Sequence, residues 1–65
     1  VQGEERDRLF LALMIRHHQG ALPMARFAAT NAAVPAVRSL AAQIAFDQAQ
    51  EIERMARLLS AMPRP

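Results

Sequence analysis

The sequence predicts an all-α fold, an antiparallel hairpin of two long amphipathic helices that forms a single unit over residues 1–65. Two observations lead to this prediction. Apolar residues recur at helical spacing through two long stretches, and a short segment of turn-forming residues at about 31–35 separates them. No segment has the alternation that is typical of a β-strand.

The first helix is expected from about residue 4 to residue 30. Its apolar stripe, counted at about 100° per residue, consists of Phe10, Leu13, Met14, His17, Ala21, Met24 and Ala28. Acidic residues such as Glu4 lie in the first turns, where carboxylates favour the positive end of the helix dipole. Pro23 cannot donate a backbone hydrogen bond to Gln19, so we expect a kink there.

The turn and the second helix follow from the residues around Pro35. Asn31 can take the left-handed conformation that ends a helix, and Val34 is pushed out of the helical region by the proline that follows it. Pro35 suits the first position of a helix, expected at about 35–61. Its stripe consists of Val37, Leu40, Ala41, Ile44, Gln48, Glu51, Met55, Leu58 and Met62. So short a connection makes the two helices antiparallel neighbours.

The small size of the chain predicts a partner or a bound metal. A unit of 65 residues buries only about 60% of the surface that its unfolded chain exposes, and small folds usually add disulfides, a metal or a partner. The chain has no cysteine, so it cannot form a disulfide, and a metal or a partner remains. The second helix also has a further apolar set, which we predict to be an interface: Phe46, Ala42, Ala45 and Ala49. We therefore predict a four-helix bundle completed by a second copy, as a dimer, or by a second hairpin of a longer parent chain.

Composition argues against several classes of protein. The eight arginines are spread along the chain, the formal net charge is +2, and no Trp or Tyr can stack on bases, so no nucleic-acid partner is expected. The longest uncharged stretch, 27–37, contains polar residues and is too short for a membrane span. Ser39 and Ser60 have no histidine at a plausible distance, and we predict that the chain is not an enzyme. No targeting segment is recognised from Val1 onward, and we expect that one was removed.

His17 and Glu51 are the most informative polar residues. They lie at the centres of the two predicted stripes, and folding the hairpin about residue 33 brings them to about the same height. A buried carboxylate or imidazole is costly unless it is paired or bound to a metal. One interpretation is therefore a metal site, and the other is a buried His–Glu pair that needs no metal.

Residues around this pair favour a metal. Met14, His18 and Met55 each lie about one turn from His17 or Glu51 and can border the same pocket. Imidazole, thioether and carboxylate together suit a transition metal, and methionine sulfur favours copper. Weaker candidates, which would act from outside the ligand set, are Gln48, Asp47 and Met24.

Three runs of the sequence together form a recognisable pattern: FLALMIRHHQGALPMA at 10–25, PAVRSLA at 35–41 and QAQEIERM at 48–55. This pattern resembles a bacterial secreted family, the domain of unknown function 305. The resemblance implies a ferritin-like four-helix fold made of two similar hairpins, of which this chain would be one. It also implies a secreted or periplasmic location.

The same resemblance bears on the site. Carried over residue by residue, the His pair of the family pattern falls on His17 and His18, and its methionines and its glutamate fall on Met14, Met24, Met55 and Glu51. Some members of the family are implicated in copper binding, so the resemblance implies copper as a possible cofactor. We therefore predict a metal-binding or metal-handling module, with copper as the metal, in a bacterial extracytoplasmic protein. The alternative is a structural helical interaction or dimerisation domain without metal.

Overall fold

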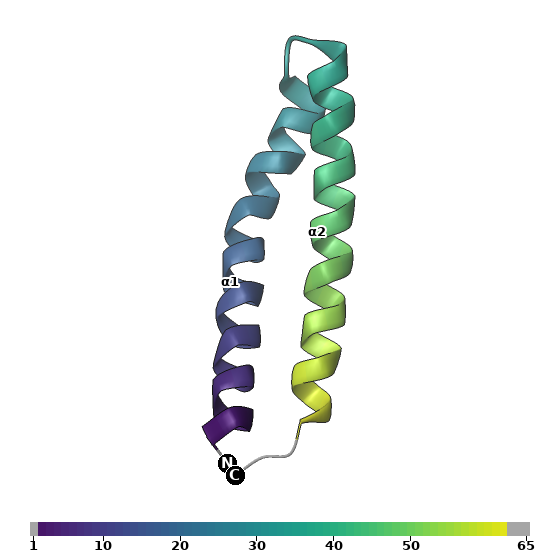
Figure 1. Cartoon of the computed structure of the whole chain (residues 1–65). Coiled ribbons are helices and arrows are strands. Elements are labelled where there is room, and N and C mark those ends of the chain that lie inside the picture. The colour runs from purple at the N-terminus through teal and green to yellow at the C-terminus, as the bar shows by residue number, and fades with distance from the viewer. Residues whose placement is uncertain (1, 63–65) are drawn as a thin grey trace.

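The computed structural model describes residues 2–62, which form two antiparallel helices. Helix α1 spans Gln2–Asn31, and helix α2 spans Pro35–Ala61. Figure 1 shows the two helices lying side by side and joined by one short connection. Because the described residues contain helices and no strand, the expectation of an all-α fold is confirmed, and a hairpin fits it.

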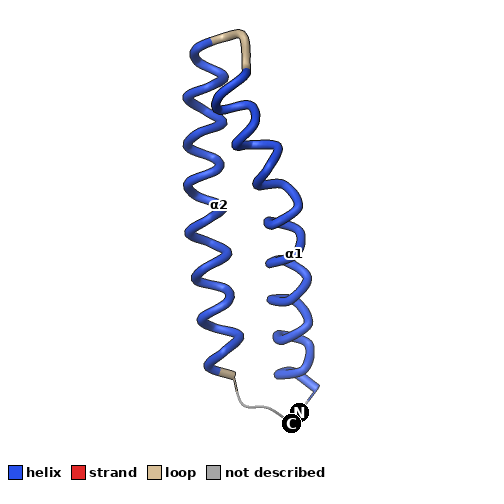
Figure 2. Tube along the Cα trace, turned by 180° about the vertical axis from the view of Figure 1, so that it is seen from behind, coloured by secondary structure: helices blue, strands red, loops and turns tan. Residues whose placement is uncertain are grey.

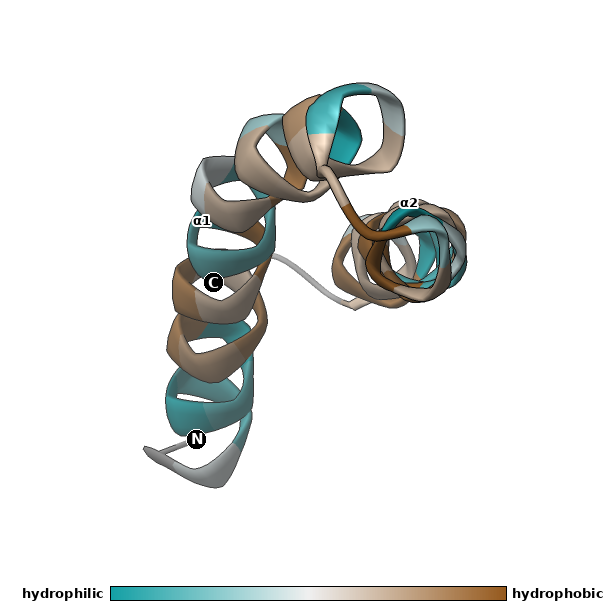
Figure 3. Ribbon diagram, turned by 90° about the horizontal axis from the view of Figure 1, so that it is seen from above, coloured by the Kyte–Doolittle hydropathy of each residue, from teal (hydrophilic) through white to brown (hydrophobic). Residues whose placement is uncertain are grey.

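Helix α1 is continuous through its internal proline. Figure 2 shows it as one uninterrupted helical tube, and Pro23 lies inside it. Pro23 and Gln19 are both exposed, so water can reach the carbonyl oxygen that loses its helical donor. Seen from above, α2 is viewed almost end-on whereas α1 runs obliquely past it (Figure 3). The predicted kink therefore does not break the helix.

The end of α1 differs from the prediction for Asn31. No described residue other than glycine has a positive φ, so Asn31 remains helical and does not adopt the left-handed conformation. Its side-chain Nδ2 instead donates to the carbonyl oxygen of Phe27 at 3.0 Å. Arg38, from the first turn of α2, donates through Nη1 to the carbonyl oxygen of Ala32 at 2.8 Å. A cation next to these carbonyls complements the negative end of the α1 dipole.

The start of α2 agrees with the prediction for the residue before a proline. Val34 is extended, with φ −91° and ψ 123°, and Pro35 begins the helix. The carbonyl oxygen of Val34 accepts hydrogen bonds from the backbone N–H groups of Val37 at 3.0 Å and Arg38 at 3.1 Å. The cap of α2 is therefore built from backbone geometry alone.

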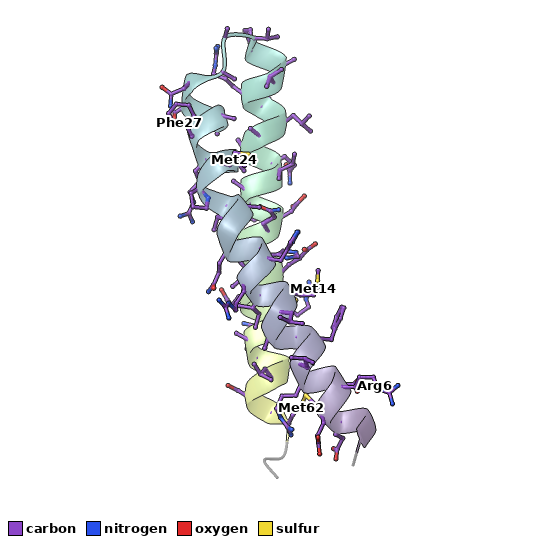
Figure 4. All side chains as sticks on the ribbon, turned by 90° about the vertical axis from the view of Figure 1, so that its left-hand side faces the viewer. Arg6, Met14, Met24, Phe27 and Met62 are labelled. Atoms are coloured by element: carbon purple, nitrogen blue, oxygen red, sulfur yellow. The ribbon has the colours of Figure 1, made fainter. Side chains whose placement is uncertain are left out.

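The hairpin has a thin core. Ala41, 7% exposed, is the one buried apolar residue among those described. The chain exposes 5081 Å², whereas a compact monomer of 7.2 kDa exposes about 4,100 Å². Its Cα radius of gyration is 15.0 Å, against about 11 Å for a globular chain of this length. Figure 4 shows side chains projecting into open space along both helices, so a single hairpin leaves much of its apolar surface uncovered.

Candidate functional site

The contact between α1 and α2 follows a heptad pattern. The half-buried residues of α1 that alternate at spacings of four and three are Leu11, Ile15, His18, Leu22, Ala25 and Ala29. The corresponding residues of α2, buried or half-buried, are Ala41, Ala45, Gln48, Ile52, Met55 and Leu59. This spacing keeps one stripe of each helix against its partner. We call these two stripes the seam; its alanines lie toward the turn, where Figure 1 shows the helices closest together.

His18 lies in the seam and makes a short polar contact across it. Its Nε2 lies 2.6 Å from Oε1 of Glu51. Its Nδ1 lies 2.9 Å from the backbone carbonyl oxygen of Met14, one helical turn earlier. The His18 side chain is 12% exposed and that of Glu51 is 54% exposed. The imidazole is therefore held between its own helix and α2, while the carboxylate reaches it from the solvent side.

The two contacts of His18 define where protons must lie. A carbonyl oxygen only accepts, so Nδ1 carries a proton that it donates to Met14. An ionised Glu51 also only accepts, so Nε2 must then donate and the ring is an imidazolium. In the alternative arrangement the Glu51 carboxyl carries the proton and donates it to Nε2. In both cases neither ring nitrogen has a lone pair free for a metal.

His17 does not occupy the position that was expected for it. The prediction that His17 and Glu51 both point into the hairpin is wrong, because both residues are exposed and His18 is the histidine that faces α2. The His17 ring meets His18 edge-on, with the ring centroids 6.0 Å apart. Within the part of the chain that the structure describes, no hydrogen bond to the His17 ring is found. Its nitrogens are thus open to a ligand or a partner.

The structure brings part of the candidate metal-ligand set together, because His18 contacts Glu51 and the His17 ring lies beside the His18 ring. Met14 and Met55 are both half-buried, but Met14 contacts His18 through its backbone carbonyl. Over residues 2–62, no group of three or more His, Cys, Asp or Glu side chains is placed to hold a metal ion. A ligand set drawn from His17, His18, Met14, Glu51 and Met55 therefore stays a prediction for this chain.

The weaker candidates have separate surroundings. Gln48 lies in the seam, and its Oε1 is buried without a hydrogen-bond partner. Asp47 is exposed and accepts a hydrogen bond from Nε2 of Gln43 at 2.9 Å. Met24 is 74% exposed, and Figure 4 shows it nearer the turn than Met14. Gln48 is thus a polar residue of the seam, whereas Asp47 and Met24 belong to the surface.

The predicted interface around Phe46 is divided between two surroundings. Ala45 lies in the seam and Ala49 is half-buried, whereas Ala42 and Phe46 are exposed. The four residues therefore do not form one outward apolar face. Phe46 is the large apolar side chain among them that stays uncovered.

A larger apolar surface lies on the side of the hairpin that includes His17. Two shallow hollows bridge the helices there: one of about 340 Å³ involves Phe10 and Leu58, and one of about 290 Å³ involves Met24 and Ile44. His17 is seven residues from both Phe10 and Met24, and Glu51 is seven residues from both Ile44 and Leu58, so these two residues share the same side. We call this surface the His17 face. Its residues are Phe10, Met14, His17, Ala21, Met24 and Ala28 of α1, and Val37, Leu40, Ile44, Asp47, Glu51, Arg54 and Leu58 of α2.

The polar residues of the His17 face form a layer at mid-height. His17 and Glu51 lie between the two hollows, with Asp47 and Arg54 each about one turn from Glu51. Apolar side chains occupy the face above and below this layer. Among the residues that the structure describes, eleven large apolar side chains are exposed, and six of them belong to this face: Phe10, Met24, Val37, Leu40, Ile44 and Leu58.

The fold and the site together define a helical hairpin domain with a His–Glu contact across its seam and one uncovered apolar face. Comparison with known families places this chain in the family described as Domain of unknown function (DUF305), whose model matches residues 1–59. The chain belongs to this family. Neither the curated proteins nor the solved structures include a match to it. In residues 2–62, neither helix combines the length and apolar character needed to cross a membrane.

The histidine that faces α2 could not be read from periodicity, because α1 has two heptad stripes that are offset by one residue. The stripe through His17 includes Phe10 and Met24, and the stripe through His18 includes Leu11 and Ala25. Both have the spacing of a buried helix face. The signal that could have separated them is the matching heptad of α2 through Ala41 and Ala45, whose small residues suit a close helix contact.

Proposed function

We propose that this chain is a helical association module, one half of a larger helical bundle, whose His17 face is covered by a further pair of helices. The observation that carries this proposal is the row of large apolar side chains left exposed along both helices of that face. Contiguous apolar surface of this extent marks an interaction site in a folded protein. In this proposal the His18–Glu51 contact is structural, because it orients the two helices.

The experiment compares the chain at decreasing concentration. An association module should melt cooperatively only when its face is covered, and at limiting dilution it should lose protection of its backbone amides and bind a dye for exposed apolar surface. Hydrogen exchange and dye fluorescence measure both effects. An isolated monomer with cooperative melting and slow amide exchange would refute the proposal, because such a chain needs no partner.

A second candidate function is metal binding with copper as the ion. It is supported by Met14 and His17, which lie three residues apart on one stripe, and by the absence of a hydrogen bond to the His17 ring in the described part of the chain. Thioether and imidazole are ligands that copper accepts. For His18 or Glu51 to join them, their mutual contact must open and the pair must release its proton. Affinity should therefore weaken as the pH falls.

Titration of the metal-free chain with Cu(I), Cu(II) and Zn(II) tests this second function. A ligand at a hundredfold excess over its Kd stabilises the folded state by about 2.7 kcal/mol, which should raise the Tm by more than about 5 °C in a chain of this size. We expect His17→Ala to abolish the shift and Met24→Leu, on the same stripe, to keep it. The absence of a shift with all three ions would refute metal binding and leave the association module untouched.

A further inference from the structure

We propose that the partner of the His17 face is the same face of a second copy of this chain, related by a two-fold axis along the length of the hairpin. The inference rests on the proposed association function and adds the identity and the orientation of the partner. In this arrangement both turns lie at the same end of a four-helix bundle. Each α1 then packs on α2 of the other copy.

The register of the face supports this orientation. Its matching positions across one hairpin are Phe10 with Leu58, His17 with Glu51, and Met24 with Ile44. The first and last of these pairs border the same hollows, and His18 bonds to Glu51 beside the middle pair. Rotation about the long axis keeps every height, so each pair recurs between copies. Apolar side chains then meet apolar side chains at both ends, and an imidazole meets a carboxylate in the middle.

The hydrogen-bonding groups of His17 and Glu51, in the middle of the His17 face, favour the same arrangement. Glu51 uses Oε1 for His18, and its other oxygen remains available to accept a hydrogen bond from His17 of the second copy. His17 has no hydrogen-bond partner among the described residues of its own chain. When the two copies dock, the imidazole of His17 is covered and gains Glu51 of the second copy as an acceptor. Its burial therefore does not leave it without a hydrogen bond.

The alternative two-fold axis runs across the hairpin and sets each helix against its own copy. Glu51 would then face Glu51 near the centre of the bundle, and two carboxylates that share a buried site cannot both stay ionised. In that arrangement Asp47 of one copy would face Arg54 of the other. Both residues are exposed at the outer edge of the His17 face, where ion pairs contribute little to stability. The central repulsion outweighs the peripheral pairing, so the axis along the hairpin is favoured.

The area of the face suits a stable dimer. The Cα trace is 49 Å long and 14 Å across, which corresponds to a face of roughly 700 Å² before side chains are counted. The surface that the chain exposes beyond that of a compact monomer, roughly 1,000 Å², is of similar size. Standard stable interfaces bury about 800 Å² per partner. The His17 face therefore has the area that one partner buries in a stable dimer, and a second copy is large enough to cover it.

Two matched substitutions in α2 test which face is used. Leu40, on the His17 face, and Phe46, on the opposite side, are each 61% exposed, so a charge at either position leaves the seam unaltered. By light scattering and sedimentation we expect the natural sequence to be a dimer, Leu40→Glu to raise the dissociation constant at least tenfold, and Phe46→Glu to leave it within about twofold. Dissociation by Phe46→Glu with Leu40→Glu still dimeric would overturn the assignment of the face.

A distance measurement tests the orientation. The chain has no cysteine, so Ala33→Cys gives one labelling site at the turn. With the turns together, two spin labels should lie within roughly 30 Å, because neighbouring helix axes in a bundle are about 8–10 Å apart. With the turns at opposite ends they should lie near the 49 Å length of the hairpin. A long distance would overturn the proposed axis and the pairing of His17 with Glu51 between copies.

The outcomes separate this inference from the function on which it rests. A monomer with exchanging amides and strong dye binding would overturn the second copy as partner, while the association function would stand with a different helical partner. A stable, cooperatively melting monomer would overturn both. A dimer that Leu40→Glu dissociates and whose turn labels are close together would support both.

Discussion

The contact between His18 and Glu51 should be measurable as a coupling free energy. Replacing Glu51 by Gln keeps a similar shape and an acceptor but removes the charge that makes the hydrogen bond strong. Hydrogen bonds to charged groups contribute about 1.5–3 kcal/mol. Because the Glu51 side chain is 54% exposed, solvent screening should reduce the coupling to about 1 kcal/mol.

A double-mutant cycle with chemical denaturation, followed by circular dichroism, measures this coupling. The four chains are the natural sequence, His18→Gln, Glu51→Gln and the double variant, all at one protein concentration because association changes apparent stability. The matched control is the cycle of His18→Gln with Glu53→Gln, because Glu53 is an exposed carboxylate of the same helix that pairs with Arg57. We expect a coupling below about 0.3 kcal/mol for this control at the same protein concentration. The reasoning would be refuted if the Glu53 cycle gave a coupling equal to or larger than the Glu51 cycle, because the structure places the carboxylate of Glu51 against His18.

Three further substitutions follow from the packing. Gln48→Met should raise the free energy of unfolding by about 1 kcal/mol, because it removes a buried Oε1 that lacks a donor; a lower denaturation midpoint would contradict this. Pro23→Ala should increase helicity and stability by roughly 1–3 kcal/mol by restoring the helical hydrogen bond to Gln19, and unchanged circular dichroism at 222 nm would count against it. Ala41→Leu should destabilise by about 1–3 kcal/mol by overpacking the most buried position, whereas Ala36→Leu, at an exposed position of the same helix, should change stability by less than about 0.5 kcal/mol in thermal melts.

The sequence by itself determined the two helices and the place of the turn. Helical periodicity and the constraint of Pro35 on Val34 are local effects, and local effects are readable from neighbouring residues. The end of α1 was less readable, because Asn31 had two ways to end a helix and the side chain of Arg38 came from the other helix to complete the turn. Family membership could also be read from the sequence, because its motifs run through nearly the whole chain.

Tertiary structure alone decided which face of α1 meets α2. Two stripes, one through His17 and one through His18, satisfy the same periodicity, and a shift of one residue turns the contact by about 100°. The choice between them depends on how closely α1 can approach α2. Near the turn the stripe through His18 presents Ala25 to Ala41, and these small side chains allow a closer approach than the stripe through His17, which has Met24 at that height. The same choice placed His18 against Glu51 and left His17 on an open apolar face. No local rule contains that information, because it is a property of the fit between two helices that are far apart in the chain.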